Sequence, residues 1–301
     1  MVSRQWAIAM IPDVPCEPSK THRGENFPVA SFLIARRHRS VILAYYRFAR
    51  GADDVADSPS LAPDEKLALL DRFEATLNGR SDTIEAALPL RAALAERKLS
   101  ARHALDLLRA FRMDAVKLRY ASWSELMDYC AYSAAPVGRF VLEVHGENES
   151  TWPASDALCT ALQIINHLQD CGADYRNLNR VYLPQDTLAA QGIGVEALGA
   201  VKASPALRAA LHAVAQQNAP LVSLGGTLPA QVRDFRLCLE TAVIARLART
   251  LNALLLVRDP LSEKVHLPKA RALAFAGIGI AEGLRAYLRP RRLTATPIGG
   301  A

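Results

Sequence analysis

The sequence has few cysteines and few aromatic residues. Its five cysteines are odd in number and form no C-x-x-C pair, so they indicate neither a disulfide framework nor a zinc site. Aromatic residues make up only 6% of the 301 positions, and alternating polar and apolar patterns of strand length are missing. These absences argue against a disulfide-rich secreted fold and against a β-sheet protein, and they favour the cytoplasm as the compartment.

Long apolar runs are missing as well. The longest uncharged apolar run, residues 272–281, is well short of the roughly 18 residues that a membrane-spanning helix needs. The first residues, MVSRQWAIAMIPDVP, are broken by proline and aspartate and do not read as a secretory signal. The sequence therefore predicts no transmembrane span and no cleaved leader.

Helical periodicity recurs along almost the whole chain, which is 50% hydrophobic and rich in alanine and leucine. The predicted helices are 29–49, 63–77, 82–96, 100–118, 123–145, 155–175, 205–218, 235–258 and 269–288. With short connections and no internal repeat, they predict one all-α domain whose helices surround a common interior. We expect an N-terminal extension at 1–20, the helical domain at 21–290 and a flexible tail at 291–301.

Two aspartates near the end of the first helical segment lie on one helix face. Asp53 and Asp57 are four positions apart, and Asp54 is turned away from them. Like charges at this spacing destabilise a helix by roughly 0.2–0.5 kcal/mol unless a cation lies between them. A solvated helix end would explain one such pair, but a second copy elsewhere in the chain favours a metal site.

The second copy lies in the segment QIINHLQDCGAD, residues 163–174. Asn166, Asp170 and Asp174 repeat at a spacing of four, and Gln163 lies one turn earlier on the same stripe. The segment is otherwise apolar, so its inner face is expected to be buried, where carboxylates need a cation or several donors. Because Mg²⁺ takes oxygen ligands from carboxylates, phosphates and water, the two stripes predict a site for several Mg²⁺ ions across an interior cavity.

Such a site implies a diphosphate substrate. Metal ions neutralise the charge that develops on a leaving diphosphate, so an allylic or cyclopropylcarbinyl C–O bond can ionise without a protein nucleophile. The rest of the cavity must be apolar, so that it holds a carbocation away from water. The residues therefore predict an enzyme that acts on a diphosphate, and the family resemblance described next implies that this substrate is a prenyl diphosphate.

Both stripes lie in motifs that resemble those of the squalene/phytoene synthase family. The first motif reads YRFARGADDVAD at 46–57, and the second reads NHLQDCGAD at 166–174, followed by RVYLP at 180–184. Between them, DYCAYSAAPVG at 128–138 is similar to the family's mid-chain helix. The resemblance extends from about residue 21 to about residue 288. It implies an all-α isoprenoid-synthase bundle around a central apolar cavity, in agreement with the periodicity.

The resemblance assigns roles to individual residues. It implies metal ligands at Asp53, Asp57, Asn166, Asp170 and Asp174, and it makes these four aspartates and Tyr129 the catalytic set. It implies diphosphate contacts from Arg50, Tyr46, Arg180 and Tyr182, and a substrate pocket that includes Asn26, Phe27, Tyr129 and Gln163. Apart from the resemblance, the aromatic residues of these sets would be taken as core side chains and the arginine at 180 as a surface charge.

Two departures from the family pattern bear on the reaction. Gln169 stands where the second motif usually has an arginine, and Glu25 and Asn26 stand where condensing members tend to carry a basic residue and a serine. Both changes reduce positive charge beside the expected diphosphate site. In these features the chain resembles the bacterial hydroxysqualene synthases of hopanoid biosynthesis, which expel diphosphate from presqualene diphosphate, open the cyclopropane and quench the cation with water.

This resemblance implies a Mg²⁺-dependent carbon–oxygen lyase that needs no NADPH. We expect Glu25 or Asn26 to position the quenching water, although Glu25 could equally pair with Arg23. Two other functions stay open. One is a condensing synthase that makes presqualene diphosphate, squalene or phytoene from two prenyl diphosphates. The other is a non-catalytic membrane-assembly factor, against which the repulsive aspartate pairs argue.

The net charge of +6 suits an anionic partner. The basic clusters at 36–39 and 289–292 lack the interleaved aromatic platform of a nucleic-acid site, so no nucleic acid is expected to bind. Arg285, Arg289, Arg291 and Arg292 lie beside the apolar run and predict a peripheral contact with the inner face of a membrane. The remaining expected partners are a prenyl diphosphate and other enzymes of the same pathway.

Overall fold

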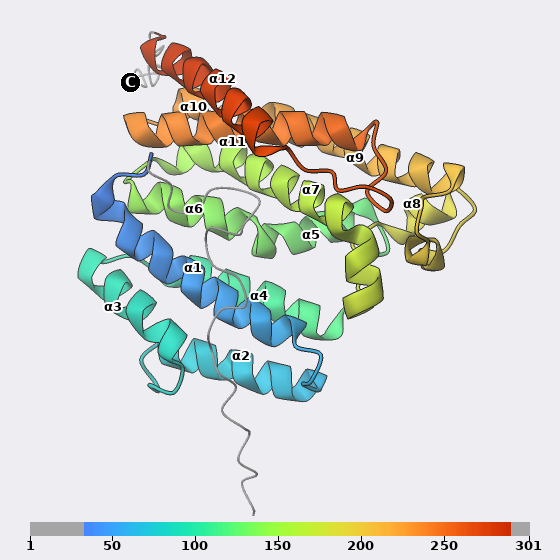
Figure 1. The fold of residues 1–301 in the computed structure, drawn as a ribbon. Coiled ribbons are helices and arrows are strands. Elements are labelled where there is room, and N and C mark those ends of the chain that lie inside the picture. Colours follow the sequence, from blue (N-terminus) through green and yellow to red (C-terminus); the bar gives the residue numbers. More distant parts are fainter. Residues whose placement is uncertain (1–32, 290–301) are drawn as a thin grey trace, which may run out of the picture.

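Apolar residues at helical spacing fold most of the described part of the chain into α-helices (Figure 1). The structure is a computed structural model, and it describes residues 33–289. Its α-helices are α1 (Arg36–Asp57), α2 (Pro63–Leu77), α3 (Leu88–Arg97), α4 (Arg102–Val116), α5 (Trp123–Ser133), α6 (Ala135–Val144), α7 (Trp152–Leu178), α8 (Gln185–Ala189), α9 (Pro205–Gly225), α10 (Leu228–Gln231), α11 (Phe235–Leu255) and α12 (Lys269–Leu288). Three short 3₁₀ turns join them: η1 (Glu85–Ala87), η2 (Glu149–Thr151) and η3 (Val195–Gly199).

The predicted all-α fold is confirmed, and each predicted helix has a counterpart. Several predicted bounds were wrong. The third helix begins at Leu88 and not at residue 82, and α9 continues to Gly225 and not only to residue 218. The segment 123–145 is two helices, because Pro136 lacks the N–H that would continue the ladder and its ring clashes with the preceding turn. The first helix was predicted to end at residue 49, but α1 continues to Asp57 because Ala52, Val55 and Ala56 extend its buried face.

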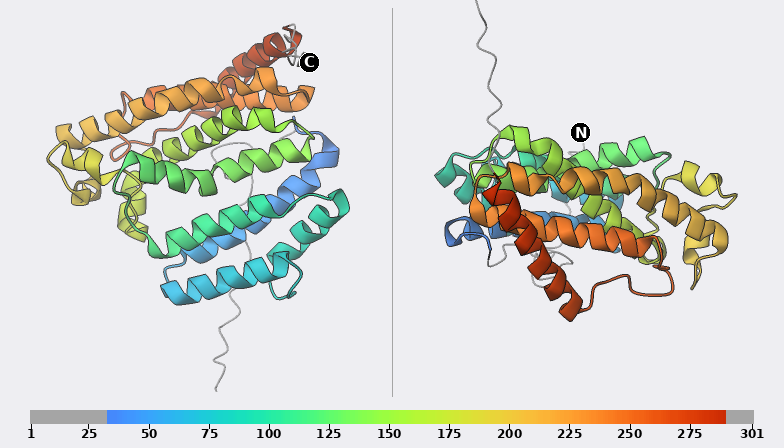
Figure 2. Two further views of the ribbon diagram at one scale, coloured as in Figure 1. Left: turned by 180° about the vertical axis from the view of Figure 1, so that it is seen from behind. Right: turned by 90° about the horizontal axis from the view of Figure 1, so that it is seen from above.

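Side-chain caps and close backbone contacts fix several helix positions. The hydroxyl of Ser122 accepts a hydrogen bond from the Glu125 N–H, as its capping-box pattern predicts, and the carboxylate of Asp234 caps α11 in the same way. A Cβ atom on Gly279 would lie 2.7 Å from the Cα of Val243, so a glycine at this position lets α12 lie directly on α11. In Figure 2, α12 crosses the outside of α11 obliquely.

The described helices bury two separate hydrophobic cores. One core is built mainly by α1, α2, α3 and α4, with Phe140 and Val144 added from α6. The other is built mainly by α5, α7, α9 and α11. In Figure 1, α1 to α4 lie on one side of a layer formed by α5 and α6, and α7, α9 and α11 lie on the other. The fold therefore leaves an interior space between two packed walls, and the candidate site occupies it.

Candidate active site

A cavity of about 550 Å³ lies between the two cores. Its walls come chiefly from α1, α4, α6, α7 and α11. On α1 alone, lining residues extend from Ile42 to Asp57, which is about 22 Å of helix at 1.5 Å per residue. Apolar side chains such as Phe111, Leu162 and Ile244 line most of this length, and the acidic residues of the two sequence stripes lie at one end. The cavity thus combines a polar end with a long apolar interior.

The C-terminal turns of α1 bring Asp53 and Asp57 to the polar end. Arg50, one turn earlier, donates from Nη1 to Asp53 Oδ2 at 2.6 Å and from Nη2 to Asp54 Oδ1 at 2.8 Å. Burial raises the pKa of Asp53 to about 8, and the charge of Asp57 adds to this rise while Arg50 opposes it. Arg50, which was predicted to contact the diphosphate, thus lies at the polar end and is paired there with Asp53 and Asp54.

On α7, Asn166 and Asp174 line the cavity, whereas Asp170 is exposed and does not. Burial raises the pKa of Asp174 to about 7, with further contributions from the charges of Asp170 and Asp57, while Arg180 lowers it. Because Asp57 lies on α1, its effect on Asp174 shows that carboxylates from the two helices share one end of the cavity. The structure therefore brings the two stripes face to face.

Arg180 connects α1 and α4 at the polar end of the cavity. Its side chain is buried, and Nη1 donates to Asp57 Oδ1 at 2.7 Å while Nη2 donates to the Asp114 carbonyl at 3.0 Å. Lys66 of α2 adds a second cation close by, since its ammonium donates to the Ala56 carbonyl at 2.8 Å. Arg180 is therefore an interior cation held in position by α1 and α4, and not the surface charge that its sequence position also allowed.

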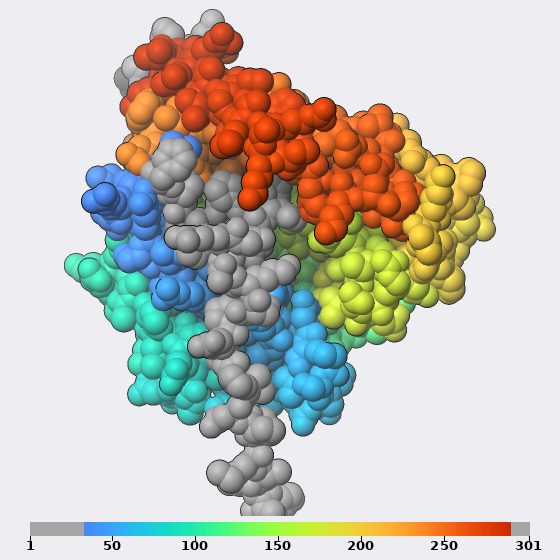
Figure 3. Space-filling view, viewed as in Figure 1, coloured from blue at the N-terminus to red at the C-terminus, as the bar shows by residue number. Residues whose placement is uncertain are grey.

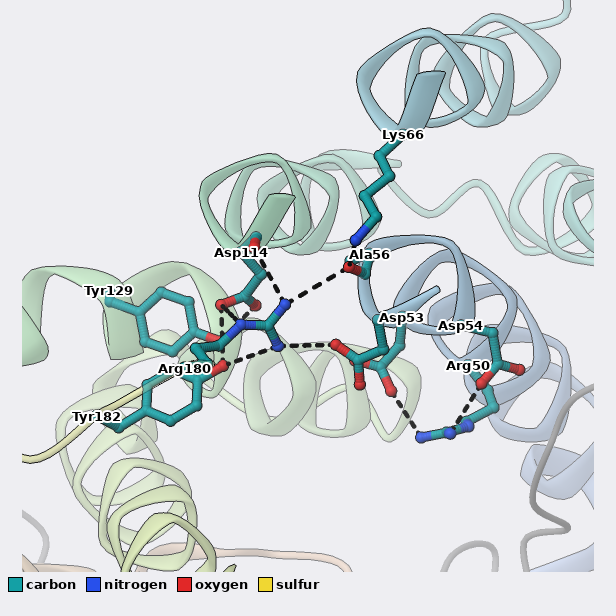
Figure 4. Close-up of polar contacts among 10 residues, drawn as sticks. Arg50, Asp53, Asp54, Ala56, Lys66, Asp114, Tyr129, Arg180 and Tyr182 are labelled. Atoms are coloured by element: carbon teal, nitrogen blue, oxygen red, sulfur yellow. Dashed lines mark hydrogen bonds and ion pairs between the residues drawn. The ribbon is translucent and has the colours of Figure 1, made fainter. Parts of the chain in front are cut away.

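Asp114 on α4 is the functional candidate that the sequence did not reveal. It is 4% exposed, and its two carboxylate oxygens accept hydrogen bonds from Tyr129 at 2.7 Å and Tyr182 at 2.9 Å (Figure 4). Burial raises the pKa of Asp114 to about 6, although Arg180 and both tyrosine hydroxyls act in the opposite direction. One signal was available: the acid occupies the apolar stripe of α4, three residues after the buried Phe111.

Aromatic rings line the boundary between the polar end and the apolar interior. His167 stacks on Tyr182 with a centroid distance of 3.6 Å, and the rings of Tyr129 and Tyr182 lie 5.5 Å apart. Burial lowers the pKa of His167 to about 3, and Arg180 adds to this effect, so the imidazole is neutral. These rings present polarisable faces without adding a positive charge.

The remaining predicted residues fall into three groups. Tyr46 and Gln163 line the cavity, as the pocket and diphosphate assignments require. Glu25, Asn26 and Phe27 lie outside the described residues. Gln169 does not line the cavity, because its buried amide donates to the Val265 carbonyl on the loop after α11. The interpretation that Gln169 lowers the positive charge at the diphosphate site therefore finds no support in the geometry.

The polar end fits a hard divalent cation by its donor chemistry. Carboxylate oxygens from Asp53, Asp57 and Asp174 and the amide oxygen of Asn166 are the ligand types that Mg²⁺ takes. Within residues 33–289, no three acidic, histidine or cysteine side chains gather around one point. Mg²⁺ does not require that arrangement, since one or two protein carboxylates suffice when phosphate oxygens and water complete its shell. The pKa values of Asp53 and Asp174 are raised, so a cation bound at this end of the cavity would stabilise their ionised carboxylates.

Comparison with known proteins decides the family. The family model for squalene/phytoene synthase matches residues 20–271. The chain belongs to the squalene/phytoene synthase family. The resemblance of its motifs to this family is thereby confirmed.

Relatives within the squalene/phytoene synthase family include two proteins named hydroxysqualene synthase. The one from Rhodopseudomonas palustris is 58% identical over 248 residues, which cover 82% of this chain and 85% of that one. The one from Sinorhizobium fredii is 55% identical over 258 residues, covering 86% and 88%. A solved squalene synthase from Alicyclobacillus acidocaldarius superposes with a TM-score of 0.67 at 31% identity, covering 77% of this chain and 89% of that one. Sequence and fold thus agree on the family.

Proposed function

We propose that this member of the squalene/phytoene synthase family is a hydroxysqualene synthase. It would ionise presqualene diphosphate, rearrange the cyclopropane and capture the cation with water, giving hydroxysqualene and diphosphate. The observation that carries the proposal is the cavity itself, with facing carboxylates at one end of a long apolar interior. The close relatives of that name support this reaction over condensation, since phytoene synthase 1 of Arabidopsis thaliana is 35% identical over 190 residues only.

The side chains at the polar end are suited to hold a diphosphate and its counter-ions. Asp53, Asp57, Asn166 and Asp174 would hold Mg²⁺, with Asp170 next to them at the exposed side of α7. When bound, Mg²⁺ neutralises charge on the departing diphosphate. These assignments follow the oxygen donors and their spacing, and chelation of the metal is their first test.

The protein's own groups would favour departure of the diphosphate. Arg180 is held by Asp57 and by the Asp114 carbonyl, so its positive charge need not be reorganised as the C–O bond breaks. Arg50 presents a second guanidinium at the same end, and Tyr46 lines the cavity beside it. In this arrangement Arg50 and Arg180 bind the leaving group, while the aspartates hold both arginines in place.

The apolar interior would protect the carbocation. The ring faces of Tyr129, Tyr182 and His167 can stabilise a cation through their π electrons, which is worth about 0.5–2 kcal/mol for each favourable contact. Beyond them, aliphatic side chains exclude water from the hydrocarbon. Water must therefore be admitted at a defined place if the product is to be a single alcohol.

The proposal is tested with purified protein, Mg²⁺ and synthetic presqualene diphosphate in the absence of NADPH. We expect hydroxysqualene and diphosphate in equal amounts, and loss of both on addition of EDTA. Farnesyl diphosphate alone provides the second arm of the assay. Formation of presqualene diphosphate, squalene or phytoene from farnesyl or geranylgeranyl diphosphate, with no hydroxysqualene from presqualene diphosphate, would establish the condensing function instead.

Folded protein with no turnover of any prenyl diphosphate would support the non-catalytic alternative. The variant Asp174→Asn removes a carboxylate from the polar end of the cavity. Asp71→Asn, which removes a carboxylate from an exposed face, is its matched control. We expect the first to lose diphosphate release and the second to retain it. Equal release from both would remove Asp174 from the proposed site.

We also propose that α12 rests on an anionic membrane surface. Within the described residues, no helix is long and apolar enough to cross a bilayer. Figure 3 shows α12 at the surface of the molecule. Its outer face exposes Leu273, Ile278, Leu284 and Leu288, and the exposed Arg285 and Arg289 lie near its C-terminal end. Such an arrangement suits a helix that lies in the headgroup region, close to apolar substrate and product. Arg291 and Arg292, which were predicted to contribute, lie outside the described residues.

Co-sedimentation with liposomes tests the membrane contact. We expect binding to vesicles that contain anionic lipid, weaker binding at high salt, and a loss in Leu273→Glu/Leu288→Glu. The control Val201→Glu changes an equally exposed apolar residue far from α12 and should bind as the unaltered protein does. Equal binding by both variants would remove α12 as the contact. Association with other pathway enzymes remains a prediction from the sequence.

A further inference from the structure

The hydroxyl group of Tyr129 is held where the polar end of the cavity meets its apolar interior. It donates to Oδ2 of Asp114 at 2.7 Å, and both residues line the cavity (Figure 4). Asp114 is tied in turn to Arg180, because its backbone carbonyl accepts from Nη2 of Arg180 at 3.0 Å. Arg180 also donates to Asp57 at 2.7 Å, so the Tyr129 hydroxyl is connected to the polar end through Asp114 and Arg180.

The cation that follows loss of the diphosphate forms next to this hydroxyl. In the proposed reaction, the carbon that loses the diphosphate lies beside the leaving group, at the polar end to which Arg180 belongs. The ring of Tyr129 lies 5.5 Å from that of Tyr182 and 6.2 Å from that of His167, and all three residues line the cavity. The cation stays within a few bonds of that carbon during the rearrangement, so the water that captures it must act close to these rings.

The two tyrosines that bind Asp114 differ in what their oxygen atoms can still accept. Tyr182 donates to Asp114 Oδ1 at 2.9 Å, and its oxygen accepts from Nη1 of Arg180 at 3.3 Å. Tyr129 donates to Asp114 as well, but within residues 33–289 its oxygen accepts no hydrogen bond. Because a phenol oxygen can donate one hydrogen bond and accept another, the Tyr129 oxygen can accept a hydrogen bond from water.

Asp114 can take the proton that Tyr129 passes on. The hydrogen bond of 2.7 Å between them gives the phenolic proton a direct path to the carboxylate. Burial raises the pKa of Asp114 to about 6, although Arg180 and both tyrosine hydroxyls oppose the rise, so the group is ionised at neutral pH and can accept a proton there. Phenol and carboxylate can therefore act together as one base that faces the cavity.

We propose that Tyr129 and Asp114 form a proton relay that deprotonates the water which captures the rearranged carbocation. This inference rests on the proposed hydroxysqualene synthase function. The water oxygen supplies both electrons of the new C–O bond. As one of its protons passes to the Tyr129 oxygen, the phenolic proton passes to Oδ2 of Asp114, and it returns to solvent through the same hydroxyl after the product leaves. The relay thereby turns the cation into an alcohol before it can lose a proton and become an olefin.

Product distribution tests the relay. The enzyme with Mg²⁺ and presqualene diphosphate in H₂¹⁸O is compared with Tyr129→Phe and Asp114→Asn, and the share of labelled hydroxysqualene among all C30 products is measured. Because this share is a ratio, a variant that only slows departure of the diphosphate leaves it unchanged. General-base assistance contributes about 10²–10⁴-fold to a rate, so we expect the share to fall by about tenfold or more in each variant, with olefins in its place.

The double variant Tyr129→Phe/Asp114→Asn shows whether the two residues act as one unit. Two members of one relay lose the same proton transfer, so the double variant should have about the same share as either single variant. An unchanged share in both single variants would overturn the inference. A share that falls in the double variant by the product of the two single effects would overturn it too.

Tyr120→Phe is the matched control. It removes a hydroxyl from the same group of rings, 5.3 Å from the ring of Tyr129, but Tyr120 does not line the cavity and its hydroxyl has no hydrogen-bond partner in the described part of the chain. This variant should keep the product share of the unaltered enzyme, and a fall equal to that in Tyr129→Phe would contradict the relay. Glu25→Gln tests the residue that the sequence favoured for the water, and a change in that variant alone would also contradict it. Absence of hydroxysqualene with the unaltered enzyme would instead refute the proposed function.

Discussion

Replacement of Asp114 by asparagine is expected to stabilise the protein while it weakens the site. The side chain is 4% exposed, and burial raises its pKa from 3.8 to about 6. In the unfolded chain the carboxyl group ionises first as the pH rises, so the unfolded state then binds fewer protons than the folded state. Stability contributed by this group is present below about pH 4 and is lost as the pH rises through about 6.

The magnitude follows from the shift. Two pKa units correspond to about 3 kcal/mol at 1.36 kcal/mol per unit, which is the cost at pH 8 of keeping Asp114 ionised in the folded protein. Asparagine resembles the neutral acid in shape, so Asp114→Asn should recover much of this cost, or about 2 kcal/mol after allowance for poorer hydrogen bonds to Tyr129 and Tyr182. At pH 4 the unaltered side chain is itself protonated, and the gain should vanish.

Urea denaturation of the two proteins at pH 4, 6 and 8 measures this difference. The control Asp71→Asn removes an exposed carboxylate that pairs with Arg112, and it should change stability by less than about 1 kcal/mol at each pH. Turnover should fall by about tenfold or more in Asp114→Asn, because Arg180 and both tyrosines lose the charge that orients them. A variant that is less stable than the unaltered protein at pH 8, or equally more stable at pH 4 and 8, would refute the reasoning.

Two further predictions concern the polar end and the packing of α12. Asp57→Asn should reduce the rate of diphosphate release by about 10²–10³-fold, because Asp57 orients Arg180 and faces Asp174. A rate within threefold of that of the unaltered enzyme would show that Asp57 does not belong to the site. Gly279→Ala should lower the free energy of unfolding by about 1–3 kcal/mol, because its methyl group would lie 2.7 Å from the Cα of Val243. In the same helix, a methyl group at Gly277 would meet no other atom within 4 Å, so Gly277→Ala should raise the free energy of unfolding by about 0.5–1 kcal/mol. Thermal unfolding of both variants in parallel measures the two effects, and equal changes in both would contradict the contact between Gly279 and α11.

The sequence revealed the site where the chemistry repeats along the chain. Asp53 with Asp57, and Asn166 with Asp174, stand at helical spacing, so one-dimensional periodicity was enough to predict that each pair shares a face. That the two faces meet was an inference from the cost of burying charge. In the structure, Asp53 and Asp57 line the same cavity as Asn166 and Asp174.

Helical spacing does not identify a functional residue that has no second functional residue on the same face of its helix. The place of Asp114 on the apolar stripe of α4 indicates burial, but its role depends on Tyr129, 15 positions later, and Tyr182, 68 positions later, which the helical pattern does not encode. The sequence also could not show where the Gln169 side chain points. Position 169 lies at the edge of the cavity-facing side of α7, and its amide donates to the carbonyl of Val265, 96 residues later. Long-range packing decides these cases, and periodicity does not encode it.

The acidic residues of the cavity share one physical property. Asp53, Asp114 and Asp174 all occupy positions where an apolar or neutral side chain would favour folding more than a carboxylate does. Burial raises the pKa of each of these aspartates, which is the expected sign of that cost. These carboxylates therefore destabilise the fold at places where a bound cation or a guanidinium can stabilise them. The folding free energy lost by burying these carboxylates is therefore a physical indication of where the reaction takes place.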